Sequence, residues 1–390
     1  MFARLQPILL AGITVRMLAE MATRAGFAVM ALDYFGDADL RGLCPGISLR
    51  RDHNISFTPD ALVNAANGLD APAVVYSASL ENHPNQVARL AQKRTLLGNA
   101  PETLVRVRDS RQLAAALRSA GFCYPQTVWP GDEIVPEITG QWLWKPMRSG
   151  GGHGVRVWHG EPLAKEGILQ KRLPGMVCSA TFVANGLEGI LVGVTEQLIG
   201  EEAFGASGFR YCGNLMPPRL PHDELLMLLR EVQSIVNYIT AEFGLRGLNG
   251  LDFIWHEGRV WTIELNPRPT APVELMEWVY DLRLFAAHVQ AFTGQLPSFD
   301  LEQAIRDAPA AGKAILFATE DIILGDTRSW FERDIRDIPY PGEHIRRGNP
   351  VCTVLAKAAT PDLCEHKLEQ RVDEIKNMAQ LGAGFIPVQV

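Results

Sequence analysis

Two carboxylates and an amide stand close together in a stretch whose pattern predicts a β-hairpin. Residues 251–267 read LDFIWHEGRVWTIELNP, with apolar, β-branched and aromatic runs on either side of a His-Glu-Gly turn. Side chains alternate along a strand, so a three-residue loop that ends at Gly258 puts Asp252, Glu264 and Asn266 on one face. Asp252 and Glu264 are then diagonal neighbours, with backbone positions on the order of 7 Å apart or less. Hard oxygen ligands without imidazole or thiolate suit Mg²⁺, so the stretch predicts a magnesium site.

The register of this hairpin decides whether the site can form. A three-residue loop sets Trp255 opposite Arg259 and Asp252 opposite Thr262, so that Thr262 joins the polar face. The other face carries apolar residues that can pack into a core: Leu251, Phe253, Trp255, Trp261, Ile263 and Leu265. A two-residue loop would place Asp252 and Glu264 on opposite faces. The alternative interpretation is a half-exposed hairpin whose outer face is merely polar.

A lysine and a glycine-rich loop lie about a hundred residues upstream. Lys145 closes an expected strand over residues 142–145, and residues 148–154 read RSGGGHG before strand alternation resumes. Such a hairpin can close over phosphates with its backbone N–H groups while a lysine supplies a point charge, although glycine-rich hairpin tips are also common in plain turns. Neither GxGxxG after the first strand nor GxxxxGK[ST] occurs, so the loop is not a dinucleotide or Walker motif.

Composition limits the class of protein. The chain has 390 residues, 47% of them apolar and 21% charged, and a length that suggests two or three globular domains. Its net charge of -7 argues against nucleic-acid binding by broad phosphate neutralisation. Six cysteines without a CxxC pair fit a reducing cytoplasm, and no apolar run reaches membrane-spanning length. We therefore expect a soluble cytoplasmic protein with small-molecule substrates.

The order of the expected elements predicts an α/β and α+β chain in three parts. Residues 1–91 show strand–helix–strand units that predict a Rossmann-like domain with a parallel sheet. Residues 92–296 contain the lysine, the glycine loop and the hairpin. Residues 297–390 predict a small accessory α+β domain without chemistry of its own.

The lysine, the glycine-rich hairpin, the strand LQKRLPG and the hairpin with its D…E.N.R spacing together resemble the ATP-grasp superfamily. The likeness runs from about Lys93 to Arg268, and IELNPR at residues 263–268 is its most specific part. The resemblance implies two α+β subdomains that clamp ATP, behind an N-terminal sheet domain. It also implies that a carboxylate is activated as an acyl phosphate.

Matching positions give each residue an expected role. The metal ligands would be Asp252, Glu264 and Asn266, and Arg268 would contact the phosphate or the substrate. The nucleotide contacts would be Lys93, Lys145, Gly150, Gly151, Gly152, Gly154, Gln170, Lys171, Arg172 and Leu173. Arg210, which is not part of the matched pattern, is a second candidate to hold the substrate carboxylate. The strand at 170–173 would meet adenine through its backbone. Met176 and Val177 depart from the pattern, because many relatives carry a ribose-binding glutamate there.

The resemblance implies an ATP- and Mg²⁺-dependent ligase, with Mn²⁺ as a substitute metal, that joins a small carboxylic acid to an amine. The acid could be an amino acid such as glutamate, and the reaction could belong to cofactor biosynthesis. A homodimer is the candidate assembly. Residues 208–214 (GFRYCGN) with Pro217 are also similar to tyramine–glutamate ligase. Three alternatives remain: a carboxylase acting through carboxyphosphate, an ATP-binding protein without turnover, and a two-carboxylate glycosidase, which leaves the lysine and glycine loop unexplained.

Overall fold

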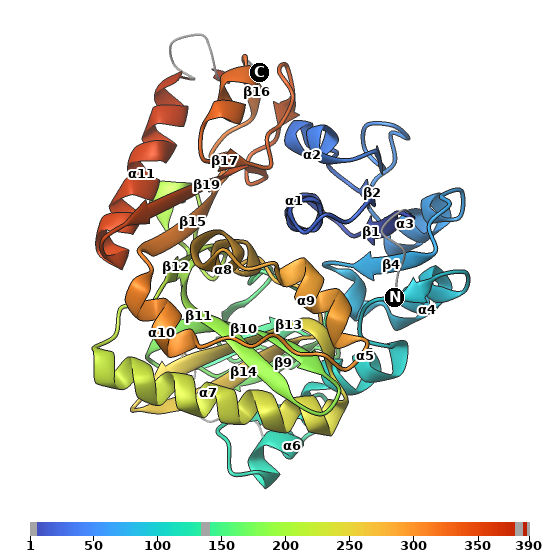
Figure 1. The fold of residues 1–390 in the computed structure, drawn as a ribbon. Coiled ribbons are helices and arrows are strands. Elements are labelled where there is room, and N and C mark those ends of the chain that lie inside the picture. The colour runs from blue at the N-terminus through green and yellow to red at the C-terminus, as the bar shows by residue number, and fades with distance from the viewer. Residues whose placement is uncertain (1–5, 134–140, 379–384, 388–390) are drawn as a thin grey trace.

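The computed structural model describes residues 6–133, 141–378 and 385–387, which fold into four β-sheets and their covering helices (Figure 1). The first sheet is parallel, with strand order β3-β2-β1-β4-β5. Its strands are β1 (Ile8–Ala11), β2 (Val29–Asp33), β3 (Gly46–Ser48), β4 (Ala73–Tyr76) and β5 (Thr95–Leu96). The helices that accompany it are α1 (Arg16–Arg24), α2 (Ala38–Leu43), α3 (Pro59–Ala66) and α4 (Pro84–Ala91). This arrangement confirms the predicted N-terminal parallel sheet, although β5 lies beyond residue 91.

Strand β1 is apolar on both faces because both are covered. Ile8 and Leu10 belong to one buried cluster with α1, and Leu9 and Ala11 belong to another with α3 and α4. Continuous apolar runs of this kind are typical of parallel strands between helical layers. The strand order reverses between β1 and β4, so their carboxyl ends flank a crevice of the kind in which α/β sheets bind ligands.

The largest sheet has eight strands in the order β14-β13-β10-β11-β12-β15-β19-β17. The strands are β10 (Met176–Asn185), β11 (Gly189–Ile199), β12 (Tyr211–Met216), β13 (Arg246–His256), β14 (Arg259–Asn266), β15 (Ala310–Phe317), β17 (Ile335–Arg336) and β19 (Pro350–Ala358). Strands β15, β17 and β19 come from the predicted accessory region and continue this sheet through the pairing of β12 with β15. The expected boundary at residue 297 therefore falls between strands of one sheet.

Helices cover both faces of the large sheet (Figure 1). The long helix α7 (His222–Phe243) packs on one face, where its Val232 shares a buried cluster with Phe182 of β10. On the other face, α8 (Val273–Tyr280) and α9 (Leu284–Ala291) share a cluster with Val183 and with residues of β1 and α1. These two helices thus join the large sheet to the N-terminal sheet.

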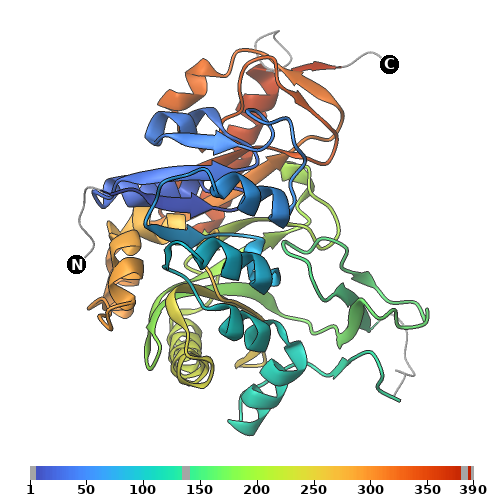
Figure 2. The ribbon, with the colours of Figure 1, turned by 90° about the vertical axis from the view of Figure 1, so that its right-hand side faces the viewer.

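Two small sheets complete the molecule. One contains β6 (Thr127–Val128), β7 (Trp142–Pro146), β8 (Arg156–Val157) and β9 (Gly167–Lys171); the other contains β16 (Ile322–Leu324), β18 (His344–Ile345) and β20 (Phe385–Pro387). The remaining helices are α5 (Pro101–Arg108), α6 (Ser110–Ser119), α10 (Leu301–Asp307) and α11 (Pro361–Met378). Figure 2 shows the sheet of β6 to β9 projecting from the rest of the molecule. None of the helices in the described residues combines the length and the apolar character that crossing a bilayer requires.

The β13–β14 hairpin differs from its predicted register in two ways. His256 pairs directly with Arg259, so the turn has two residues, Glu257 and Gly258, both with positive φ (50° and 69°). The predicted three-residue loop is therefore wrong. The two-residue turn is favoured because positive φ at both of its positions gives it a twist that matches the flanking strands. A β-bulge after Asp252 then shifts the register by one residue and sets this aspartate directly opposite Glu264.

The two-residue turn also reverses the faces of three side chains relative to the prediction. Thr262 lies opposite Phe253 and is fully buried in the core, not on the polar face where it was predicted. Trp261 and Ile263 were predicted to face the core but are only partly buried, and Trp261 lies opposite Ile254. The prediction that the two carboxylates share a face holds only because the bulge offsets the shorter turn.

A buried histidine links the two main sheets. His288 of α9 accepts a hydrogen bond at Nδ1 from the backbone N–H of Leu248 in β13 (2.8 Å). Its Nε2 lies 3.1 Å from the carbonyl oxygen of Leu97, just after β5, so the neutral ring that donates from Nε2 satisfies both partners. Burial lowers the pKa of His288 to about 4.

We predict that acid weakens the fold through His288. The ring has a folded pKa of about 4 against an unfolded value near 6.5, so its stabilisation is present above pH 6.5 and is lost as the pH falls towards 4. The loss should reach about 3 kcal/mol over this window. Urea unfolding of His288→Gln at pH 7 and pH 4.5 should show a smaller pH dependence than the parent, while the exposed His366→Gln control should retain it. Equal pH dependence in all three proteins would contradict the assignment.

Candidate functional site

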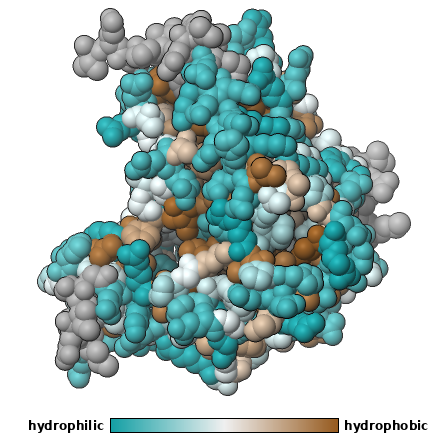
Figure 3. Space-filling model, turned by 90° about the vertical axis from the view of Figure 1, so that its left-hand side faces the viewer, coloured by the Kyte–Doolittle hydropathy of each residue, from teal (hydrophilic) through white to brown (hydrophobic). Residues whose placement is uncertain are grey.

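A cavity of about 1380 Å³ runs between the small β6–β9 sheet, the large sheet and the carboxyl edge of the N-terminal sheet. Figure 3 shows the molecule hollowed between the projecting lobe and the part above it. The hairpin carboxylates, the lysine and the glycine loop all line this cavity. Three sheets that are far apart in the sequence therefore meet at one site.

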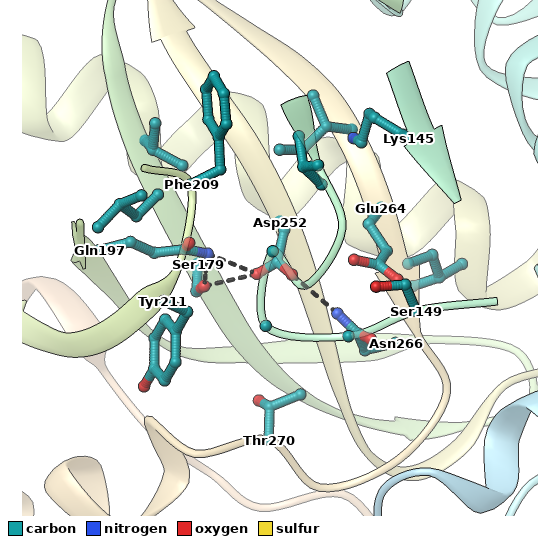
Figure 4. A pocket seen from close by; sticks show the side chains of 18 of the residues that line it. Lys145, Ser149, Ser179, Gln197, Phe209, Tyr211, Asp252, Glu264, Asn266 and Thr270 are labelled. Carbon is teal, nitrogen blue, oxygen red and sulfur yellow. Dashed lines mark hydrogen bonds between the residues drawn. The ribbon is translucent and has the colours of Figure 1, made fainter. Parts of the chain in front are cut away.

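Asp252 lies at the centre of the cavity and is held by three donors (Figure 4). Its Oδ1 accepts hydrogen bonds from Ser179 Oγ (2.5 Å) and Gln197 Nε2 (2.9 Å), and its Oδ2 accepts one from Asn266 Nδ2 (2.9 Å). Ser179 pairs with Asp252 across β10 and β13, so the strand register places the first donor. These contacts fix the direction of the carboxylate.

Glu264 is balanced by a residue that the sequence analysis missed. Arg108, the last residue of α5, donates from Nη1 to Glu264 Oε1 at 2.6 Å. Burial alone would raise the pKa of Glu264, but the positive charges of Arg108, Lys145 and Arg268 outweigh it and hold the pKa below its usual range. Glu264 is therefore ionised at neutral pH.

The two carboxylates are the basis for a divalent-cation site. Burial, and next the negative charge of Glu264, raise the pKa of Asp252 to about 6. A cation between the two acids would remove this repulsion, and Asn266 adds a third oxygen of the hard type that Mg²⁺ prefers. Within the described ranges no group of three or more His, Cys, Asp and Glu side chains could hold a metal. The donor set here is two carboxylates and an amide, which fits an ion that takes its remaining ligands from water or phosphate.

Lys145 projects into the cavity from β7, above the carboxylates in Figure 4. Its Nζ donates to Gln170 Oε1 at 3.0 Å, and Gln170 in turn donates to Thr127 Oγ1 at 3.2 Å. Burial lowers the pKa of Lys145, which Glu264 and Asp252 counteract. The lysine is therefore positioned by strand β9 as a cation near the acid pair.

Residues of the expected adenine strand also reach the cavity. Gln170 and Lys171 end β9, and Arg172 and Leu173 continue the chain along the cavity wall. The backbone N–H of Lys171 bonds to Gln126 O and that of Arg172 to Gln141 O, both at 2.8 Å. These bonds hold the strand end between the starts of β6 and β7 in the small sheet.

The glycine loop lies against the segment before β12. The backbone N–H of Tyr211 donates to Gly151 O at 3.0 Å, and a Cβ on Gly152 would lie 1.8 Å from Phe209 O. Gly152 also has φ of 73°, which side chains other than glycine rarely adopt. Only glycine permits this contact. Gly150, Gly151 and Gly152 line the cavity, whereas Gly154, at φ 77°, does not.

Two predicted contacts lie elsewhere. Lys93 is exposed in the turn after α4 and does not line the cavity. Arg210 is also outside the cavity wall, because its guanidinium stacks on the Phe317 ring, 3.8 Å from the centroid. Arg268 does line the cavity, and its Nε pairs with the buried Glu81 at 2.7 Å.

Arg108, Ser179 and Gln197 join the site without having been predicted. Each lies on a different element, α5, β10 and β11, and makes its contact across more than fifty residues of sequence. Ser179 could have been found from the pairing of β10 with β13, since it stands directly opposite Asp252. No local pattern marks Arg108 or Gln197.

Comparisons with known proteins agree with this geometry. Residues 107–272 match the model of the ATP-grasp domain family. An uncharacterised protein of Methanocaldococcus jannaschii is 23% identical over 368 residues, which cover 90% of this chain and 88% of that protein.

Two solved structures share the fold at low sequence identity. The biotin carboxylase domain of Hydrogenobacter thermophilus 2-oxoglutarate carboxylase, in complex with MgADP, ADP and bicarbonate, has a TM-score of 0.71 and 14% identity, covering 98% of this chain and 91% of that one. The L-amino acid ligase of Bacillus licheniformis has a TM-score of 0.65 and 13% identity, covering 99% of this chain and 100% of that one. The resemblance to the ATP-grasp superfamily is thus confirmed for residues 107–272, which form an ATP-grasp domain.

Proposed function

We propose that the protein is an ATP- and Mg²⁺-dependent ligase that activates a substrate carboxylate as an acyl phosphate and joins it to an amine. The observation that carries the proposal is the direct opposition of Asp252 and Glu264 on a bulged hairpin that lines the same cavity as Lys145. The ATP-grasp family match supports it, and so does the likeness of fold to an L-amino acid ligase.

The cavity wall would provide distinct surroundings for each part of the nucleotide. The strand end at residues 170–173 would meet the base, between apolar walls that include Ile168, Val177 and Ile254. Lys145 and the N–H groups of the glycine loop would bind the phosphates. The positions of Met176 and Val177 offer the ribose no carboxylate, so its hydroxyls would depend on other polar residues of the wall.

Asp252, Glu264 and Asn266 would hold the metal ion. When bound, a divalent ion neutralises phosphate charge and holds the transferring group in line. Ser179 and Gln197 keep Asp252 directed into the cavity, and Arg108 does the same for Glu264. The protein then contributes positioning and fixed charge, which is most of what phosphoryl transfer needs.

The reaction needs no side-chain nucleophile. A carboxylate oxygen of the substrate attacks the γ-phosphorus, and the bond to the β-phosphate oxygen breaks to release ADP. The amine nitrogen then attacks the acyl carbon, the carbon–oxygen bond to phosphate breaks, and phosphate leaves as the nitrogen loses a proton. Arg268, paired with Glu81 through Nε, is a cavity arginine whose guanidinium would hold the carboxylate.

A second candidate is a carboxylase that acts through carboxyphosphate. The fold shared with a biotin carboxylase domain bound to bicarbonate favours it. Bicarbonate would then be the carboxylate that attacks the γ-phosphorus. A strict requirement for bicarbonate, with no turnover of other acids, would select this alternative over the ligase.

The experiment that tests the proposed function is a phosphate-release screen with Mg-ATP across small acids, amino acids and amines. A ligase releases phosphate only when an acid and an amine are both present, and the amide product should appear in equal amount by mass spectrometry. Binding of ATP without release for any pair would instead indicate a nucleotide-binding protein without turnover.

We predict that Glu264→Gln abolishes activity and leaves the fold intact. The side chain faces the cavity and not the core, so the amide keeps the shape while one metal-binding charge is lost. Phosphate release should fall at least about hundredfold. The melting temperature should change by only a few degrees. Activity equal to that of the parent would contradict the metal assignment.

Lys145→Ala should weaken nucleotide binding. Removal of a cation that makes charged hydrogen bonds costs roughly 1.5 to 3 kcal/mol, or about ten- to hundredfold in affinity. Calorimetric titration with Mg-ATP measures the change. The exposed Lys93→Ala serves as the matched control, because it lies outside the cavity and should bind like the parent.

Gly152→Ala should displace the glycine loop from the backbone of Phe209, which it contacts. The added methyl group would meet Phe209 O and force a strained φ, at a cost of about 1 to 3 kcal/mol. Affinity for Mg-ATP should then fall roughly tenfold. Gly150→Ala is the control, because nothing lies within 4 Å of its added Cβ and its φ is not positive. Equal loss in both variants would show that the loop contact does not matter.

A further inference from the structure

The cavity continues past the acid pair to a second end beside the N-terminal sheet. This far end is bounded by the start of α1, the segment after β4, strands β15 and β19, and the turn that follows β17. Its lining residues are Thr14, Arg16, Ser77, Lys313, Asp337 and Thr353. They lie outside residues 107–272, so the ATP-grasp match does not cover them. A volume of about 1380 Å³ also exceeds the usual range of roughly 300 to 1,000 Å³ for a single small ligand.

Among the described residues that line the cavity, four are acidic. Asp252 and Glu264 form the pair at its centre, and Asp109 caps α6 by accepting from the N–H groups of Arg111 and Gln112. Asp337 is the fourth and the one at the far end. The proposed nucleotide and metal contacts do not include it.

The Asp337 carboxylate is exposed to the cavity, whereas the neighbouring side chains of Arg16 and Lys313 are buried. The side chain is 29% exposed, against 2% for Arg16 and 5% for Lys313. Arg16 donates from Nε to Asp337 Oδ1 (3.0 Å), and Thr353 donates from Oγ1 to Asp337 Oδ2 (2.6 Å). Arg16 Nη2 also donates to Oδ2 at 3.5 Å, so Oδ1, which has a single donor, is the oxygen that can accept a further hydrogen bond from a ligand.

The cations at this end are already neutralised. Arg16 and Lys313 both pair with the buried Glu274, Lys313 at 2.6 Å, and Arg16 also faces Glu20, Asp39 and Asp337. Arg336 pairs with Glu20 at 3.1 Å. Three cations thus face four carboxylates, and the accessible charge is the negative one.

Asp337 stays ionised in these surroundings. Burial would raise its pKa, but the charge of Arg16 outweighs it and lowers the pKa below its usual range. Two backbone N–H groups of the turn, those of Asp337 and Ile338, bond to Asp39 at 2.9 Å and fix the position of the aspartate. Its φ of 55° is the left-handed conformation that aspartate tolerates better than most residues.

We propose that the far end of the cavity binds a protonated amino group of the substrate, with Asp337 as the residue that accepts its hydrogen bonds. The inference rests on the proposed ligase function and names a substrate class for it. A nitrogen held as an ammonium has no lone pair, so it is not the nitrogen that forms the amide. The substrate therefore carries a second, non-reacting amino group, either on the acid, as in an amino acid, or on the acceptor, as in a diamine.

Paired probes test this class directly. Diamines of two to six carbons are compared with the amino alcohols of the same length, and amino acids such as glutamate with their 2-hydroxy acids. Each pair differs only in an ammonium replaced by a hydroxyl. Titration into the full-length protein with Mg-ADP should show at least one ammonium member binding roughly ten- to hundredfold tighter than its partner. If no ammonium member of either series binds more tightly than its partner, the proposal is wrong.

Variants then assign the preference to one residue. Asp337→Asn should reduce the preference to about threefold or less and leave Mg-ATP binding unchanged. Asp334→Asn is the matched control, since this aspartate pairs with Arg371 outside the cavity and should keep the preference. Should Asp337→Asn fail to fold, Asp337→Glu keeps a charge for Arg16 and should favour a diamine about one carbon shorter. A preference that survives in Asp337→Asn, or an unshifted length preference in Asp337→Glu, would overturn the assignment.

Phosphate release separates this inference from the proposed function. Release driven by an acid and an amine without regard to a second ammonium would support the ligase and overturn the role of Asp337. Ammonium binding that depends on Asp337, with no release for any pair, would support the subsite and contradict the ligase.

Discussion

The opposition of two carboxylates across a hairpin is the constraint on which the rest of the site depends. Asp252 and Glu264 can face each other only because a β-bulge compensates for a two-residue turn. Once together they repel, and that repulsion contributes to the raised pKa of Asp252. The surrounding residues offset this repulsion with positive charge and hydrogen bonds. Arg108 pairs with Glu264, while Ser179, Gln197 and Asn266 donate to Asp252.

The partners of this pair come from elements on every side of the cavity. Arg108 belongs to the helix that follows the N-terminal sheet, Lys145 to the projecting small sheet, and Ser179 to the large sheet. The site is therefore assembled from parts whose relative placement depends on the whole fold. His288, buried between the two main sheets, is one of the contacts that fix this placement.

Much of the site could be predicted from sequence because its chemistry is concentrated in short patterns. The spacing of Asp252, Glu264 and Asn266 indicated a cation site, and the glycines after Lys145 indicated a loop over phosphates; both groups line one cavity. Turn length was harder, since His-Glu-Gly suits a two- or a three-residue loop and a bulge leaves no signal in composition. The exchange of faces by Thr262 and Ile263 follows from that one error.

Partners supplied by tertiary contact could not be predicted in this way. Lys93 was selected by its place in a family pattern, yet the helix α4 ends two residues before it and leaves the side chain exposed outside the cavity wall. Arg210 was expected to contact the substrate, but its guanidinium stacks on the aromatic ring of Phe317, more than a hundred residues later in the sequence. Only the folded chain identifies Arg108 as the neighbour of Glu264.

The continuation of the large sheet into the C-terminal region limits how this chain can be divided. Strand β15 pairs with β12 through residues 213–216, and β19 and β17 follow in the same sheet. A chain shortened at residue 296 would leave β12 as an unpaired edge, whose free N–H and C=O groups would recruit strands from other molecules. Such a fragment would aggregate. The C-terminal region from residue 297 therefore cannot be exchanged as a module in the way that a separately folded domain can.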